Sequence, residues 1–166
     1  MLVIYKKLTL LLTGLVMSSV LHAAPLVYIP LGSGNAVIEV DGKTDKIINH
    51  YEGVNNPHGL VATPDGEYLF AGSLMEDNKL KEQGNLRNSK LYMVHPAHGH
   101  VMQTVAVEGW SHHQAITPDG RYVLSTHPTR NHVSIVDVET AQQITTIETG
   151  NAPYYILVTP NGRSAY

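Results

Sequence analysis

The sequence predicts an all-β protein built from repeated four-stranded antiparallel sheets. The first observation is a Thr-Pro-Asp/Asn-Gly turn that occurs three times, with its proline at Pro64, Pro118 and Pro160. The second is a series of short runs rich in β-branched residues between turn-forming residues, which is the pattern of strands joined by hairpins. The third is the spacing: a repeat of about 40 residues with four strands is typical of a propeller blade.

One complete unit lies at 110–150. Apolar or alternating runs occupy 121–126, 132–137 and 143–147, and a further short run follows Trp110. The breaks between these runs carry Pro, Asp, Asn and Thr, which favour tight turns. The segment therefore predicts four consecutive strands in one antiparallel sheet.

The rest of the chain consists of copies of this unit. Segment 55–109 is a blade enlarged by the polar insertion 74–88, and segment 25–54 holds the second, third and fourth strands but lacks the innermost one. Segment 151–166 begins a further blade. Because propellers close with about four to eight blades, we expect an N-terminal fragment with about three blades, whose missing C-terminal blades are needed for closure.

Two stretches carry a family resemblance. Asn56–Phe70, and Pro118–Leu124 together with Val133–Val138, resemble the YVTN type of β-propeller repeat. The resemblance covers 25–166, implies a seven-bladed ring, and extends to propellers that bind haem d1 and more distantly to lactonase propellers. The shared residues are turn and strand residues, so the resemblance implies a fold more directly than an activity.

Residues 1–24 have the pattern of a secretory signal peptide. Two lysines precede an apolar stretch at 8–21, and the small residues Ala23 and Ala24 end it. A membrane span needs about 20 apolar residues, so an uncleaved anchor is the less favoured alternative. We expect cleavage after Ala23 or Ala24, a periplasmic or secreted protein, and no membrane span after cleavage.

Charge and composition argue against several function classes. The chain has 14 acidic and 11 basic residues, a formal net charge of −3, and cleavage of the leader makes it more acidic. A mildly acidic protein without a basic stripe argues against nucleic acid as a partner. Cysteine is absent, which excludes disulfides and a covalent c-type haem. Motifs for a serine-hydrolase elbow, a phosphate-binding loop and a zinc-protease helix are missing as well.

The predicted topology sorts polar residues onto two faces. Because the chain runs up and down within a blade, the loops between second and third strands share one face with the crossings between blades, here called the crossing face. The repeated proline turns lie on the opposite, turn face. His58, His112 and Tyr154 stand at the same distance before each repeat proline. They begin the innermost strands, so we expect them to ring the mouth of the central channel.

These side chains point to metal or cofactor binding. Imidazole is a common ligand of metals and of haem iron, so we expect His58 and His112 as ligands of a divalent metal, with His113 and Tyr154 beside them. The family resemblance implies haem d1 as the alternative cofactor, with one of these histidines as iron ligand. Arg130 suits a cofactor carboxylate because its planar guanidinium group can donate two parallel hydrogen bonds to the two carboxylate oxygens. Further rim residues are Trp110, His127 and Tyr155.

Structural alternatives stand beside these assignments. A His or Tyr at the start of an inner strand can simply bond the backbone of the neighbouring blade, and Pro57-His58-Gly59 can simply set a turn. His95, His98 and His100 form either a surface metal clip or an ordinary polar turn, and the turn is favoured because no carboxylate is nearby to complete a metal site. The insertion 74–88 is either a solvated loop or a lid or partner contact over the mouth.

Two classes of function follow. The repeat favours a non-enzymatic binding scaffold that presents its crossing face to a protein or small-molecule ligand. The resemblance implies, as the second class, a haem d1-binding or redox propeller. A lactonase-like hydrolase is a weaker third possibility, because that chemistry needs acidic metal ligands near the axis and the inner-strand starts carry His and Tyr instead. No catalytic residue is assigned, and whether the protein is an enzyme stays open, with non-enzymatic binding favoured.

Overall fold

The computed structural model describes residues 25–166, so the predicted signal peptide at 1–24 lies outside the described residues. Within residues 25–166, almost all regular structure is β, with one short helix and one 3-10 turn. The elements in chain order are β1 (Leu26–Leu31), β2 (Ala36–Asp41), β3 (Lys46–Glu52), β4 (Pro57–Ala62), β5 (Leu69–Ser73), α1 (Asn78–Glu82), β6 (Ser89–His95), η1 (Pro96–His98), β7 (His100–Val107), β8 (Gln114–Ile116), β9 (Tyr122–His127), β10 (His132–Asp137) and β11 (Gln142–Glu148).

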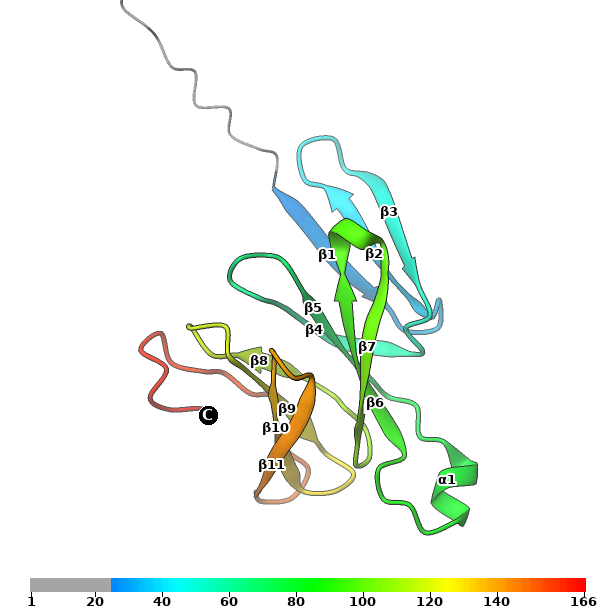
Figure 1. The fold of residues 1–166 in the computed structure, drawn as a ribbon, viewed down its shortest axis with the longest axis vertical. Helices are drawn as coiled ribbons and strands as arrows, with labels where there is room; N and C mark the ends of the chain where they lie inside the picture. Colours follow the sequence, from blue (N-terminus) through cyan, green and yellow to red (C-terminus); the bar gives the residue numbers. More distant parts are fainter. Residues whose placement is uncertain (1–24) are drawn as a thin grey trace, which may run out of the picture.

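The strands form three antiparallel sheets that follow one another along the chain (Figure 1). Their strand orders are β1-β2-β3, β4-β5-β6-β7 and β11-β10-β9-β8. Within each sheet, consecutive strands are hydrogen-bonded neighbours, as in the blades of a propeller. The predicted all-β class and the antiparallel blades are thereby confirmed. The exact blade boundaries and the number of blades in a closed ring stay predictions.

The repeated turns adopt one geometry. In the first of them the Thr63 hydroxyl donates to the Asp65 carboxylate, and the same carboxylate accepts from the Glu67 backbone N–H at 3.0 Å. The following Gly66 has a φ of +75°, a left-handed conformation that glycine adopts without steric cost. Gly120 repeats this conformation at φ +74°. The aspartates at these positions are therefore turn formers, as the sequence predicts.

Apolar side chains fill the two junctions between neighbouring sheets. The first and second sheets share a buried cluster around Tyr51 and Leu69. The second and third sheets share another, around Phe70, Leu91 and Val123. Successive residues of β5 thus face opposite junctions, because side chains alternate across a strand. Burial of these side chains, at about 1.5–3 kcal/mol for each large one, holds the sheets face to face.

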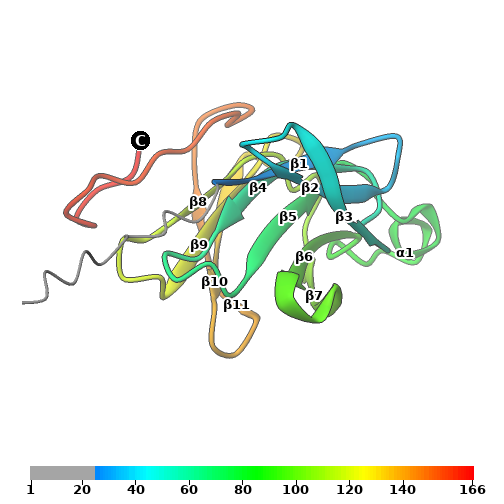
Figure 2. The same cartoon turned by 90° about the horizontal axis from the view of Figure 1, so that it is seen from above.

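The first strands of the second and third sheets lie close together (Figure 2). A Cβ on Gly72 would lie 2.3 Å from the Ser111 carbonyl oxygen, and one on Gly59 would lie 2.4 Å from the His112 carbonyl oxygen. Glycine at these two positions lets the crossing from the second sheet to the third run directly over β4 and β5. Within residues 25–166, no helix has the length and apolar character needed to cross a bilayer.

Candidate metal centre and crossing face

Backbone hydrogen bonds fix the crossing that carries two of the candidate ligands. The Ser111 N–H donates to the Ser73 carbonyl at 2.9 Å, which ties the crossing to the preceding sheet. The His112 N–H donates to the Thr126 carbonyl at 2.9 Å, and the Thr126 N–H donates to the His113 carbonyl at 3.0 Å. These bonds join the crossing to β9 and hold both histidines in place.

His58 on β4 meets His112 and His113 of this crossing. The ring centroid of His58 lies 4.4 Å from that of His112 and 5.2 Å from that of His113. One nitrogen from each of the three rings lies within 4.8 Å of the other two, a grouping able to hold a metal ion. His112 is buried, His113 is half-buried and His58 is exposed. The cluster therefore sits at the surface with one open side.

The electrostatics favour neutral imidazoles. Burial lowers the pKa of His112, and the neighbouring His58 and His113 lower it further, while the Tyr154 carbonyl acts in the opposite direction. Burial also lowers the pKa of His113, again assisted by His58. The Nδ1 atoms of His112 and His113 lie 2.6 Å apart, so one ring donates to the other. Neutral rings keep nitrogen lone pairs available, which metal binding requires.

Two tyrosines of segment 151–166 pack against the histidines. The Tyr154 ring lies edge-on to His112 with centroids 4.5 Å apart, and the Tyr155 ring lies 4.0 Å from that of His113. Thr126 donates to the Tyr154 carbonyl at 3.0 Å and thereby fixes this segment. The predicted meeting of His58, His112 and Tyr154 is present in the structure. His113, expected beside these residues, lies with its ring centroid 4.6 Å from that of His112, and Tyr155, expected at the rim, packs against His113.

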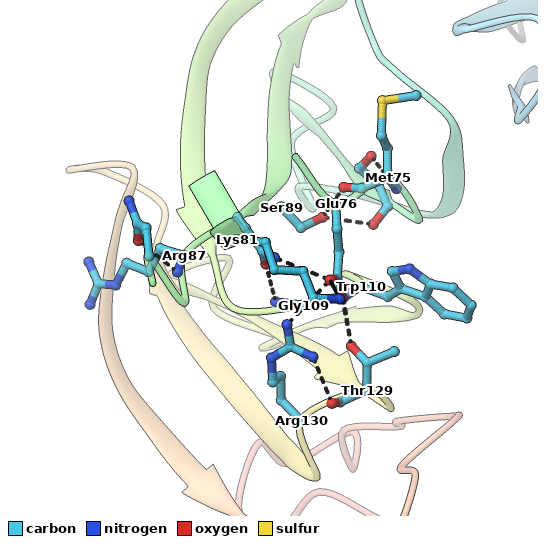
Figure 3. A network of polar contacts seen from close by, with 12 residues as sticks. Met75, Glu76, Lys81, Arg87, Ser89, Gly109, Trp110, Thr129 and Arg130 are labelled. Atoms are coloured by element: carbon cyan, nitrogen blue, oxygen red, sulfur yellow. Dashed lines mark hydrogen bonds and ion pairs between the residues drawn. The ribbon is translucent and has the colours of Figure 1, made fainter. Parts of the chain in front are cut away.

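Arg130 lies in a different network, shown in Figure 3. Its guanidinium pairs with the Glu76 carboxylate at 3.3 Å. Glu76 also accepts from Thr129 at 3.2 Å and from the Asn88 amide at 3.1 Å, and Lys81 lies 3.4 Å away. Burial alone would raise the pKa of Glu76, but Arg130 and these hydrogen bonds lower it below its usual value. Arg130 is thus engaged by Glu76, which the sequence did not single out.

The same network fixes the insertion 74–88. The insertion contains α1, whose first turn is capped by Asp77: the carboxylate accepts from the backbone N–H groups of Lys79 and Leu80. Glu76 then links this segment to the loop between β9 and β10 through Arg130. The start of the insertion is therefore tied to the third sheet through Glu76, while no residue of α1 is buried. Trp110 lies beside the network and remains 38% exposed.

His127 lies inside the third sheet rather than at the rim. It is fully buried and pairs across the sheet with His132, with ring centroids 4.7 Å apart. Its Nε2 is 2.8 Å from the Ser134 hydroxyl. Burial lowers the pKa of His127 to about 3, and His132 contributes in the same direction. His127 is therefore a neutral structural residue near neutral pH.

The histidines of the turn face form a stack. The rings of His95 and His98 are 4.0 Å apart and nearly parallel, and His98 and His100 stack at 6.0 Å. His95 accepts from the backbone N–H of His98 and so caps the 3-10 turn. The Glu67 carboxylate lies 3.8 Å from His95, so a carboxylate is nearby, contrary to the expectation, but the capping bond of His95 still favours the polar-turn interpretation over a metal clip.

The comparisons with known proteins support the fold. No protein-family model matches the sequence, and no curated protein matches it. A solved structure of hydrazine synthase from Kuenenia stuttgartiensis matches with a TM-score of 0.73 at 20% sequence identity, covering 84% of this chain and 37% of that chain. This chain thus spans little more than a third of that structure's length. A likeness at this identity shows the propeller fold alone. The YVTN type of repeat and the haem d1 relationship stay predictions.

Proposed function

We propose that this chain is part of a β-propeller that acts as a binding scaffold through its crossing face, where His58, His112 and His113 hold a divalent transition-metal ion. The observation that carries the proposal is the approach of three imidazole nitrogens to within 4.8 Å of one another. These ligands come from two separate segments of the chain. A purely structural role accounts for the contact of His112 with Tyr154 but gives no reason for the exposed His58 ring to stand against both other rings.

The donor set restricts the metal. Three imidazoles without a carboxylate suit zinc, copper, nickel or cobalt. Calcium and magnesium prefer oxygen ligands. Three protein ligands also leave a coordination position open for a bound group. A metal held here would therefore offer a binding position on the crossing face to a donor atom of a small molecule or of a protein partner.

Haem d1 fits the same residues less well. Haem d1 would need only one of these histidines as its iron ligand, which leaves the grouping of all three imidazole nitrogens within 4.8 Å of one another without a role. Arg130, the residue expected to hold a cofactor carboxylate, is bonded to Glu76. A lactonase-like site would need acidic ligands, and the three-residue group consists of histidine alone. With the leader peptide predicted for 1–24, the proposed scaffold acts in the periplasm or outside the cell.

Metal titration of the full chain tests the proposal. Cobalt(II) is added to protein freed of metal with a chelator, and visible absorption and metal analysis are recorded. We expect about one ion per chain, displaced by zinc, with absorption bands typical of nitrogen ligands. Calcium and magnesium at the same concentrations should not compete.

Single alanine variants assign the ligands. His58→Ala and His113→Ala should each weaken cobalt binding by at least the roughly 10- to 100-fold that loss of a residue supporting a ligand costs, since each variant removes one of the three ligands themselves. His50→Ala is the matched control because His50 is an exposed histidine on β3, an edge strand of the first sheet, and does not belong to the three-histidine group. Equal affinity in wild type, His58→Ala and His113→Ala would refute the site.

A further inference from the structure

A cavity lies near the insertion, apart from the histidine cluster. It has a volume of about 280 Å³, and its lining includes Asn55, Met75, Asp77, Asn88, Lys90 and Tyr92. Its residues come from the crossing that precedes β4, from the two ends of the insertion, and from β6. Ligand pockets for drug-sized molecules have volumes of about 300–1,000 Å³, so this cavity suits a molecule of a few heavy atoms.

Hydrogen bonds within the protein set the shape of the cavity. The Ser73 hydroxyl donates to the Asn55 carbonyl at 2.7 Å. The Ser89 hydroxyl donates to the Met75 carbonyl at 2.7 Å, and so ties the two ends of the insertion together. The Asp77 N–H donates to the Asn88 carbonyl at 2.6 Å and forms a second bond between the two ends of the insertion. The cavity is therefore formed before any ligand arrives.

Two donors of β6 line this cavity. Lys90 and Tyr92 are two residues apart on the strand, so their side chains leave the same face. Tyr92 is only 3% exposed, and its hydroxyl has no hydrogen-bond partner within residues 25–166. Burial raises the pKa of Tyr92 and outweighs the backbone and side chain of Asn55, which act in the opposite direction, so the hydroxyl keeps its proton and is able to donate. Lys90 is exposed and takes part in none of the ion pairs of the described chain.

We propose that this cavity binds a small organic monocarboxylate, whose oxygens accept hydrogen bonds from the Tyr92 hydroxyl and the Lys90 ammonium group. A buried hydroxyl without a partner costs free energy, and a charged acceptor supplies the stronger kind of hydrogen bond. The short apolar chain of the ligand lies against the Met75 side chain. The Asp77 carboxylate lines the same cavity, so a second carboxylate on the ligand is disfavoured.

Asp77 also decides between two kinds of monocarboxylate. One oxygen of its carboxylate caps α1 by accepting from Lys79 and Leu80. The other carboxylate oxygen can accept a hydrogen bond from an ammonium group of the ligand. A simple fatty acid uses only the Lys90 and Tyr92 donors, whereas an α-amino acid also pairs with Asp77. Both ligands share the carboxylate that the proposal names.

Calorimetric titration of the full chain, in the presence of a chelator, tests the proposal with propionate, alanine and propylamine. We expect binding of propionate or alanine at millimolar concentrations and no binding of propylamine. Tyr92→Phe and Lys90→Gln should each weaken that binding by about tenfold. Lys46→Gln, which removes an exposed lysine of β3, should leave it unchanged. Tighter binding of alanine than of propionate, lost in Asp77→Asn, would identify the ligand as amino-acid-like.

The opposite results overturn the proposal. Preferred binding of propylamine, no heat with either carboxylate, or equal affinity in wild type, Tyr92→Phe and Lys90→Gln would each do so. Circular dichroism and urea denaturation show whether the variants remain folded, and Tyr92→Phe preserves the ring that packs between the first two sheets. His58→Ala should bind propionate or alanine as wild type does, so failure of the metal site and failure of this cavity are distinguishable.

Discussion

Acidification should destabilise the protein through His127. This residue is fully buried, and burial lowers its pKa from 6.5 to about 3. The unfolded chain therefore binds a proton at His127 below pH 6.5, while the folded protein does so only near pH 3. Between these values the unfolded state holds more protons, so the free energy of unfolding falls as pH falls. At 1.36 kcal/mol per pH unit, His127 alone should cost about 2 kcal/mol between pH 6.5 and pH 5.

Urea denaturation followed by circular dichroism at pH 7 and pH 5 measures this loss. His127→Gln is the comparison variant, because its amide can still bond the Ser134 hydroxyl but does not titrate. The variant should be less stable at pH 7, yet lose about 2 kcal/mol less than wild type on acidification. His112 and His113 titrate equally in both proteins and cancel in the difference. An identical loss in wild type and variant would refute the assignment of acid sensitivity to His127.

Three further predictions concern packing and the insertion. Gly72→Ala places a Cβ 2.3 Å from the Ser111 carbonyl oxygen and should lower the free energy of unfolding by about 1–3 kcal/mol through overpacking; an unchanged urea midpoint would contradict this. Glu76→Gln leaves Arg130 without its charge partner, so limited proteolysis should cut the insertion faster than in wild type, and equal rates would count against this tie between the insertion and the third sheet. Phe70→Ala empties a fully buried position and should cost about 3–5 kcal/mol in thermal or urea denaturation, whereas a cost below 1 kcal/mol would argue against this core.

The repeat made part of the site predictable. Pro-Asp-Gly turns have local chemistry that fixes their backbone, so the strand boundaries follow from them. Equivalent positions in successive blades then meet, and this reasoning alone placed His58, His112 and Tyr154 together. The argument needs only the backbone geometry of the blade, because every copy repeats it.

What the repeat does not fix is the direction of neighbouring side chains outside strands. His113 does not stand at the position that recurs before each repeat proline, so it was expected beside the ligands. The crossing is irregular at 111–113, and there both rings turn to the same side. Glu76 was missed for another reason: it lies in an insertion that no other copy contains, 54 residues from its partner Arg130.

The position of the histidines couples metal binding to the packing of the blades. His58 belongs to β4 of the second sheet, while His112 and His113 belong to the crossing that hydrogen-bonds to β9 of the third. An ion bound by all three would join two sheets that otherwise meet through apolar side chains. Binding that occurs only in the folded arrangement stabilises it, by about 2.7 kcal/mol when the free ion is at 100 times its dissociation constant. A substitution that loosens the packing between the second and third sheets should therefore also weaken metal binding, because the three ligands lie together only while β4 and the crossing keep their positions.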